Sequence, residues 1–125
     1  MFKNCKNSNL KGNVGLGVCI SFLTKSGYIV SLPLNDSQKY DVIFDDKNNL
    51  YKVQVKTTSY IKKGVYVVKM DTTTYNYTYF FDNSFVDFLF VFCENGDCYM
   101  IPSNIIECKS KLHLGKKYFK YKIIL

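Results

Sequence analysis

The sequence predicts one α/β (α+β) domain with a mixed central sheet, and three observations support this. The chain has 125 residues, a length that suits one domain with one hydrophobic core. Hydrophobic residues make up 47% of it and aromatic residues 17%, so a core can form without disulfides. One helical stretch near the N-terminus is followed by several short runs of strand type. There is no repeat or linker, so we expect residues 1–125 to form a single domain.

The expected elements follow from hydrophobic period and turn residues. The best helix candidate is 11–25, with Asn9 as its cap and Gly27 at a position where helices commonly end. Each glycine inside it weakens the helix by roughly 1 kcal/mol relative to Ala, which indicates close approach to a neighbouring element. Residues 71–83 are expected to be an exposed loop with a short helix or turn, and Ser103 to cap a short helix through residue 106. Strands are expected at 28–32, 40–45, 50–56, 64–70, 86–93, 98–101 and 118–124.

The hairpin of residues 40–45 and 50–56 carries the most informative polar side chains. If Asp45 pairs with Leu50, the same register sets Asp41 opposite Gln54, with roughly 5 Å between their Cβ atoms. Lys56 lies one step beyond Gln54 on the same face. A carboxylate, an amide oxygen and an ammonium on one face suit a divalent metal and the phosphate it activates. Polar side chains on the solvent face of a hairpin are also common, so spacing alone is a weak signal.

Each residue of this hairpin has an expected role. Asp41 and Gln54 would supply side-chain oxygens to the metal, and the backbone carbonyl of Val55 is a plausible third ligand. Lys56 would orient and help to deprotonate the attacking water, or neutralise charge that develops on the phosphorane. The expected catalytic residues are therefore Asp41, Gln54 and Lys56, and the expected cofactor is Mg²⁺ or Mn²⁺.

The charge balance favours a polyanionic partner. The net charge is +7 and the pI about 9.1, which indicates nucleic acid ahead of a membrane surface. A basic, lysine-rich proteome is the alternative explanation. Lysines in turns and tails would mostly meet phosphates. The candidates for DNA contact are Lys52, Lys62, Lys63, Lys69, Lys116 and Lys117, together with Lys109, Lys111, Lys120 and Lys122.

Three further observations bound the function. We find no signal peptide and no apolar run of the roughly 20 residues that a spanning helix requires, so an intracellular protein, in the cytoplasm or an organelle matrix, is expected. The five cysteines contain no CxxC pair, and free thiols are expected more than metal ligands. Asp87 stands in a nearly apolar strand, where we expect it to be a structural hydrogen-bond acceptor.

Six segments, in chain order, carry a further signal: 11–15, 24–34, 40–43, 51–57, 84–92 and 98–102. This ordered set resembles the PD-(D/E)XK group I intron homing endonucleases, most of all the small cyanobacterial type whose catalytic motif reads Q-x-K. The resemblance implies a restriction-endonuclease-like core, a mixed central sheet flanked by helices. It implies metal-dependent cleavage of double-stranded DNA at a long target site, with Asp41, Gln54 and Lys56 in the catalytic places. It also implies a homo-oligomer (dimer or tetramer), because one subunit offers one site for two DNA strands.

One position departs from the family pattern. Members usually carry an acid on the first helix, after the glycine that aligns with Gly15, and this chain has Leu16 there. The departure leaves open a catalytically weakened or inactive DNA-binding protein on the same scaffold. A Holliday-junction resolvase-like nuclease with the same core is the other alternative.

Overall fold

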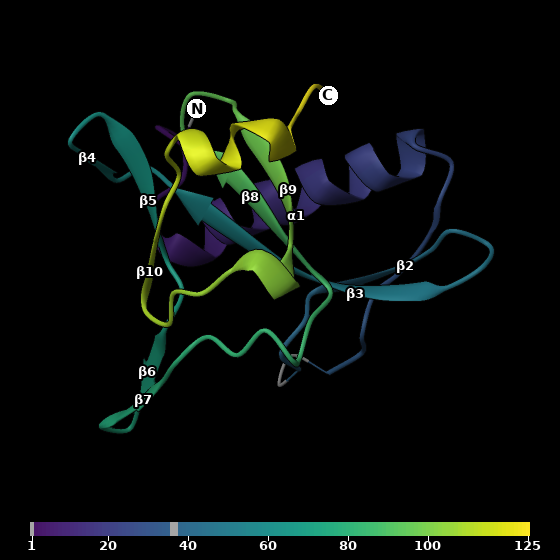
Figure 1. Ribbon diagram of the computed structural model, residues 1–125, viewed down its shortest axis with the longest axis horizontal. Helices are drawn as coiled ribbons and strands as arrows, with labels where there is room; N and C mark the ends of the chain where they lie inside the picture. Colours follow the sequence, from purple (N-terminus) through teal and green to yellow (C-terminus); the bar gives the residue numbers. More distant parts are fainter. Residues whose placement is uncertain (1, 36–37) are drawn as a thin grey trace.

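A six-stranded mixed sheet forms the centre of the molecule (Figure 1). The computed structural model describes residues 2–35 and 38–125, apart from the side chain of Thr74. The strand order is β1-β2-β3-β8-β9-β11, in which β3 and β8 run parallel and the other neighbours antiparallel. The predicted fold class is therefore confirmed. The strands span Ile29–Ser31 (β1), Val42–Asp45 (β2), Leu50–Thr58 (β3), Phe88–Cys93 (β8), Cys98–Pro102 (β9) and Lys122–Ile123 (β11).

Helix α1, Ser8–Lys25, covers one face of this sheet (Figure 1). The predicted cap at Asn9 is wrong, because the helix starts three residues earlier than expected. Asn7 is the cap, and its side chain accepts a hydrogen bond from the backbone N–H of Leu10. The predicted end is confirmed: Gly27 follows the helix with a φ of +87°, a conformation that glycine adopts without strain.

Only one of the helix glycines makes the close approach that the sequence suggested. A Cβ atom on Gly15 would clash with the side-chain methyl of Thr57 on β3. At Gly12 and Gly17, by contrast, a Cβ would meet no described atom within 4 Å. Gly15 therefore sets how closely α1 packs on β3, directly beside the predicted catalytic Lys56.

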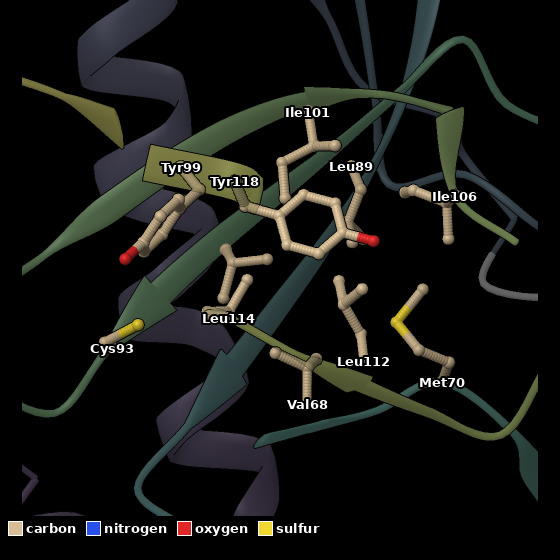
Figure 2. Close-up of a cluster of buried hydrophobic side chains, with 11 residues drawn as sticks. Val68, Met70, Leu89, Cys93, Tyr99, Ile101, Ile106, Leu112, Leu114 and Tyr118 are labelled. Carbon is tan, nitrogen blue, oxygen red and sulfur yellow. The ribbon is translucent and has the colours of Figure 1, made fainter. Parts of the chain in front are cut away.

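The opposite face of the sheet is covered by strands and 3₁₀ turns. Leu112, Leu114 and Tyr118 pack there on Leu89 and Ile101 of the central sheet (Figure 2). This second layer gives the sheet a buried cluster on each face. It consists of β4 (Ile61–Lys62), β5 (Val65–Lys69), β10 (Lys111–His113), η1 (Ser103–Ile105) and η2 (Lys116–Tyr121).

Three local predictions are wrong. The segment 71–83, expected as a loop, contains the paired strands β6 (Thr72–Thr74) and β7 (Tyr77–Tyr79). No described side chain of these two strands is buried, so the sequence lacks the alternation that marks a strand. The terminal strand expected at 118–124 is mostly η2, with only β11 in the sheet. Ser103 does not cap η1: its hydroxyl donates to the Val86 carbonyl, and Pro102 is the N-cap residue.

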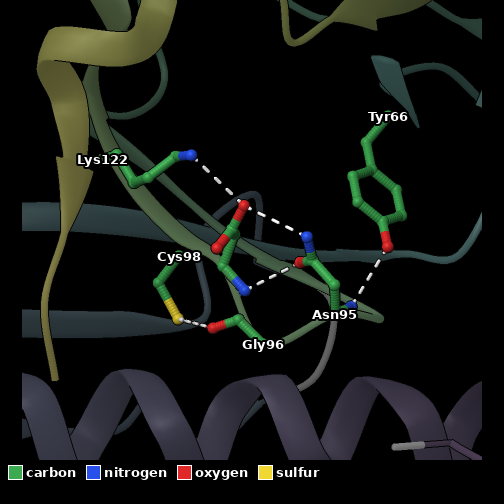
Figure 3. Close-up of polar contacts among 6 residues, drawn as sticks. Tyr66, Asn95, Gly96, Cys98 and Lys122 are labelled. Atoms are coloured by element: carbon green, nitrogen blue, oxygen red, sulfur yellow. Dashed lines mark hydrogen bonds and ion pairs between the residues drawn. The ribbon is translucent and has the colours of Figure 1, made fainter. Parts of the chain in front are cut away.

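The turn between β8 and β9 joins both layers and the C-terminal strand (Figure 3). The Nζ of Lys122 lies 3.2 Å from Oδ2 of Asp97, which fastens β11 beside β9. The Tyr66 hydroxyl of β5 accepts the Asn95 N–H at 3.1 Å. Polar contacts thus fix the β8–β9 turn at the end of the sheet that lies away from the hairpin carrying Asp41.

Candidate active site

The β2–β3 hairpin has the register that the sequence predicts. Asp45 pairs with Leu50 and Val42 with Val53. Asp41 lies just before β2, and its backbone N–H donates to the Val53 carbonyl at 2.8 Å. Pairing with β2 stops at Val53, whereas β3 continues to Thr58. Residues 55–58 of β3 therefore have an open edge on the β2 side.

The Asp41 carboxylate binds this open edge. Its Oδ2 accepts the backbone N–H of Val55 at 2.7 Å. Among the hydrogen bonds of the described residues, Oδ1 of Asp41 accepts none. The N–H and C=O of one strand residue point to the same neighbouring position, so the Val55 carbonyl faces this edge as well. Asp41 and Val55 thus present two oxygens at one place.

Lys56 is half-buried and near enough to this carboxylate for the two charges to interact. Burial lowers the pKa of Lys56, and so does Lys69, while Asp41 and Asp71 raise it. Burial in turn raises the pKa of Asp41, although the side chain keeps access to solvent, and the Val55 N–H and Lys56 oppose that shift. A lysine whose ammonium form is disfavoured and a carboxylate whose charged form is disfavoured therefore stand as neighbours. Such a pair is typical of a functional site.

Helix α1 approaches Asp41 through Leu16 and Cys19. Leu16 lines a hollow of about 240 Å³ together with Asp41 and Tyr40. Cys19 is one helical turn further on and fully buried. Burial raises the pKa of Cys19 to about 12, and the charge of Asp41 contributes to this shift. Leu16, at the position where the family resemblance predicts an acid, therefore lines the same hollow as Asp41.

Gln54 lines a different hollow. This second hollow, about 60 Å³ in volume, is bounded by Gln54, Lys39 and Tyr79 among others. The Gln54 side chain is half-buried. The structure thus brings Asp41, Val55 and Lys56 together and places the Gln54 side chain in the adjoining hollow.

A basic groove lies between the end of β3, from Thr57 onward, and the start of α1. The groove has a volume of about 560 Å³, and three lysines line it: Lys11, Lys69 and Lys111. Asp71 and Thr73 lie in the same groove. Lys69 and Asp71 both act on the pKa of Lys56, so the groove adjoins the candidate site. Ammonium groups along a groove suit a phosphate backbone.

The other predicted DNA contacts are spread over the surface. Lys52 is exposed, and its Nζ lies 5.3 Å from the centre of the Tyr40 ring. Lys62 and Lys63 are at the exposed turn between β4 and β5. Lys116 and Lys117 begin η2, which packs over β9. Of the six, Lys69 alone lines the groove beside Lys56.

Three charged residues near the site were not among the predictions: Lys11, Lys39 and Asp71. Lys11 belongs to α1, far from the hairpin in sequence. Lys39 has its Nζ 5.2 Å from the centre of the Tyr79 ring, a contact that only the unexpected β7 creates. For Lys39, proximity to Asp41 in the sequence was an available signal. Asp71 lies two residues after β5 and could not have been found without knowing that β5 packs beside β3.

Asp87 has the structural role that the sequence predicted. Its Oδ2 accepts the Lys52 backbone N–H at 2.8 Å, and its own N–H donates to the Lys52 carbonyl. Within residues 2–35 and 38–125, no three side chains of His, Cys, Asp or Glu lie close enough together to hold a metal ion by themselves. No described helix is both long and apolar enough to cross a bilayer.

Comparisons with known proteins identify the family and a similar fold. The family model for PD-(D/E)XK endonucleases matches residues 6–120. Among solved structures, the bacterial homing endonuclease I-Ssp6803I is similar, with 28% sequence identity and a TM-score of 0.81. The match covers 93% of this chain and 88% of that protein. A search of curated proteins gave no match. The chain therefore belongs to the PD-(D/E)XK endonuclease family.

Proposed function

We propose that this protein is a metal-dependent endonuclease that cuts double-stranded DNA at a long target site, as a homing enzyme associated with a group I intron. The observation that carries the proposal is the open edge of β3. There Asp41 is fixed by the Val55 N–H at 2.7 Å, and Lys56 lies beside it in a half-buried position. The similarity to the homing endonuclease I-Ssp6803I over 93% of the chain supports the same conclusion.

The donor atoms at this edge fit a magnesium ion. Mg²⁺ keeps several waters and is commonly held by one or two carboxylates together with substrate phosphates. Asp41 offers its Oδ1, and the Val55 carbonyl faces the same edge. Gln54, in the adjoining hollow, is the third proposed ligand. When bound, Mg²⁺ or Mn²⁺ would polarise a phosphate oxygen and lower the pKa of a bound water.

Lys56 would act on the attacking water and on the charge of the phosphate. Partial burial lowers its pKa, so the neutral amine that accepts a proton is reached at a lower pH than for an exposed lysine. In its charged form the same ammonium stabilises the developing phosphorane. Asp41 and Gln54 would fix the geometry around it.

The basic groove gives the DNA backbone a path past the site. Lys11, Lys69 and Lys111 line it, and the net charge of +7 favours association with DNA. Lys52, Lys62, Lys63, Lys116 and Lys117 are proposed as further phosphate contacts. One subunit has one candidate site, so a double-strand cut would require a dimer or tetramer.

A cleavage assay tests the proposal. The substrate is a plasmid that carries the DNA flanking the coding sequence, with the coding sequence itself removed. We expect wild-type protein with Mg²⁺ to linearise it, and Lys56→Met to lower the rate about 10²–10⁴-fold, the usual contribution of a positioned proton-transfer group. Lys6→Met, which removes an exposed lysine near the N-terminus, is the matched control. Binding without cleavage in either Mg²⁺ or Mn²⁺ would overturn the proposal.

A second candidate, a DNA-binding protein with weakened or absent cleavage, is favoured by one observation. Leu16 shares a hollow with Asp41, and the family resemblance predicts an acid at its position. If the missing carboxylate limits activity, Leu16→Glu should raise the cleavage rate and lower the Mg²⁺ concentration that is required, because a second carboxylate strengthens the metal site. Leu16→Gln is the control of similar size without the charge. A junction resolvase would instead prefer four-way junctions to linear duplex in the same assay.

A further inference from the structure

The β6–β7 ribbon, defined as residues 72–79, contributes nothing to the core. Neither buried cluster includes any described side chain from it. The two strands form a sheet of their own, separate from the central sheet. The exposed fractions of Tyr75, Tyr77 and Tyr79 are 92%, 70% and 53%. An isolated two-stranded hairpin is marginally stable in water, so exposed aromatic residues on one indicate a partner.

The ribbon has a defined shape. Thr73 pairs with Thr78 and their hydroxyl oxygens lie 3.3 Å apart on one face, while Tyr77 and Tyr79 share the other face. Two residues, Tyr75 and Asn76, form the turn, with φ values of 50° and 70°. Positive φ at both positions is typical of a type I′ turn, which places these two side chains at the tip.

The base of the ribbon lies beside the candidate active site. Thr72 and Tyr79 line the hollow that contains Gln54, and Thr73 lines the basic groove. The Nζ of Lys39 lies 5.2 Å from the centre of the Tyr79 ring, so a positive charge stands on the aromatic face. Figure 1 shows the ribbon projecting away from the central sheet. DNA held at Asp41 and Lys56 would therefore meet the ribbon within a few base pairs of the cut.

We propose that the β6–β7 ribbon enters the major groove of duplex DNA and reads bases there, with Tyr75 and Asn76 as the specificity-determining residues. This inference rests on the proposed function, since it assumes a duplex in the site. The B-DNA major groove is about 12 Å wide and 8.5 Å deep and admits a two-stranded ribbon, whereas the minor groove is about 6 Å wide and admits one only when the DNA is deformed. Three to four residues of strand reach about 10–13 Å, enough to touch the groove floor.

The chemistry of the tip matches base edges. The Asn76 amide offers a donor and an acceptor, the pair that matches N6 and N7 of adenine. The methyl groups of Thr73 and Thr78 can contact thymine methyls. The lysines at the base would hold the phosphates on either side and thereby fix the register of the ribbon in the groove.

The test measures base preference by binding, so it does not depend on cleavage. Wild-type protein in EDTA is used to select from a pool of randomised 30-base-pair duplexes, and the selected sequences are compared with those of two variants. Asn76→Gly removes the amide while keeping the turn, because glycine adopts a φ of 70° freely. Tyr75→Gly removes the aromatic ring and relieves the φ of 50° at that position.

We expect Asn76→Gly to lose about 5- to 100-fold of discrimination at one or two adjacent positions and to leave the others unchanged. Tyr75→Gly should weaken duplex binding without lowering the melting temperature. Asn48→Gly, an exposed asparagine in the β2–β3 turn, is the matched control and should keep the wild-type preference. Unchanged preference in both ribbon variants would overturn the proposal, as would tighter binding to a single-stranded pool. The two proposals can fail separately. If the ribbon variants lose base preference but Lys56→Met cuts as well as wild type, the proposed catalytic role of Lys56 is wrong and the proposed role of the ribbon stands.

Discussion

Two aspartates, Asp41 and Asp87, lie at opposite edges of strand β3, and each makes the same pair of hydrogen bonds with it. Oδ2 of Asp41 accepts the Val55 N–H at 2.7 Å, and Oδ2 of Asp87 accepts the Lys52 N–H at 2.8 Å. Each also donates its backbone N–H to a β3 carbonyl at 2.8 Å. Each stands one residue before a strand that pairs with β3. Their local geometry is therefore nearly equivalent.

What lies beyond the two carboxylates differs. On the Asp87 side, β8 pairs with β3 from Val53 to Thr58, so the backbone edge is filled. On the Asp41 side, β2 pairs only as far as Val53, and the edge that follows is open. Lys56 and helix α1 surround that open edge. Both carboxylates stabilise β3. Asp41 is the candidate metal ligand of the two, because its neighbouring strand ends there and the half-buried Lys56 lies close by.

The largest expected effect separates the two aspartates in cleavage. Asp41→Asn keeps an oxygen for the Val55 N–H but removes the negative charge, and should lower the cleavage rate by about 10²–10³-fold. Asp87→Asn makes the same chemical change at the filled edge and should stay within about threefold of wild type, the scale of ordinary surface substitutions. The measurement is the rate at which each variant linearises the plasmid under saturating Mg²⁺. Equal losses in the two variants would show that the open edge confers no special role on Asp41.

Sequence reasoning succeeded for this site where the signal was local. The register from Asp45 to Leu50 followed from period and turn composition alone, and it fixed where Asp41 stands. The Asp87 acceptor was equally predictable, because a lone carboxylate in an apolar run requires a donor.

Long-range packing accounts for what sequence reasoning missed. Asp71 reaches Lys56 only because β5 packs beside β3. Lys39 meets Tyr79 only because residues 72–79 form a ribbon rather than a loop. None of the ribbon's described side chains joins a buried cluster, so the hydrophobic pattern could not predict it.

The approach of α1 to the Asp41 side of β3 gives a second, smaller test. Gly15→Ala would press a methyl group against Thr57, one residue from Lys56, and should cost about 1–3 kcal/mol of unfolding free energy, as overpacked cores do. Gly12→Ala and Gly17→Ala have open space and should instead stabilise the helix by about 1 kcal/mol each. Urea unfolding at pH 7 measures all three. If Gly15→Ala were as stable as the other two, the contact with Thr57 would not set the position of the helix.

The smallest expected effect is on stability, and it distinguishes the aspartates by its pH dependence. The pKa of folded Asp41 is raised above its ordinary value of 3.8, chiefly by burial, so the charged carboxylate is disfavoured in the folded state. At low pH the Asp41 carboxyl is protonated in both the folded and the unfolded protein, so it does not lower the free energy of unfolding. The loss of stability develops as the pH rises from 3.8 through the raised pKa, and it is complete at neutral pH. Asp41→Asn should therefore melt at a higher temperature than wild type at pH 7, and the difference should disappear as the pH falls to about 3.5.

The exposed Asp87 carboxylate of the wild type accepts the Lys52 N–H. Asp87→Asn should melt at a slightly lower temperature than wild type at pH 7, because an amide oxygen is a weaker acceptor than a carboxylate. Thermal unfolding without metal or DNA between pH 3.5 and 8 makes the comparison, and a melting temperature of Asp41→Asn below that of wild type at pH 7 would contradict it.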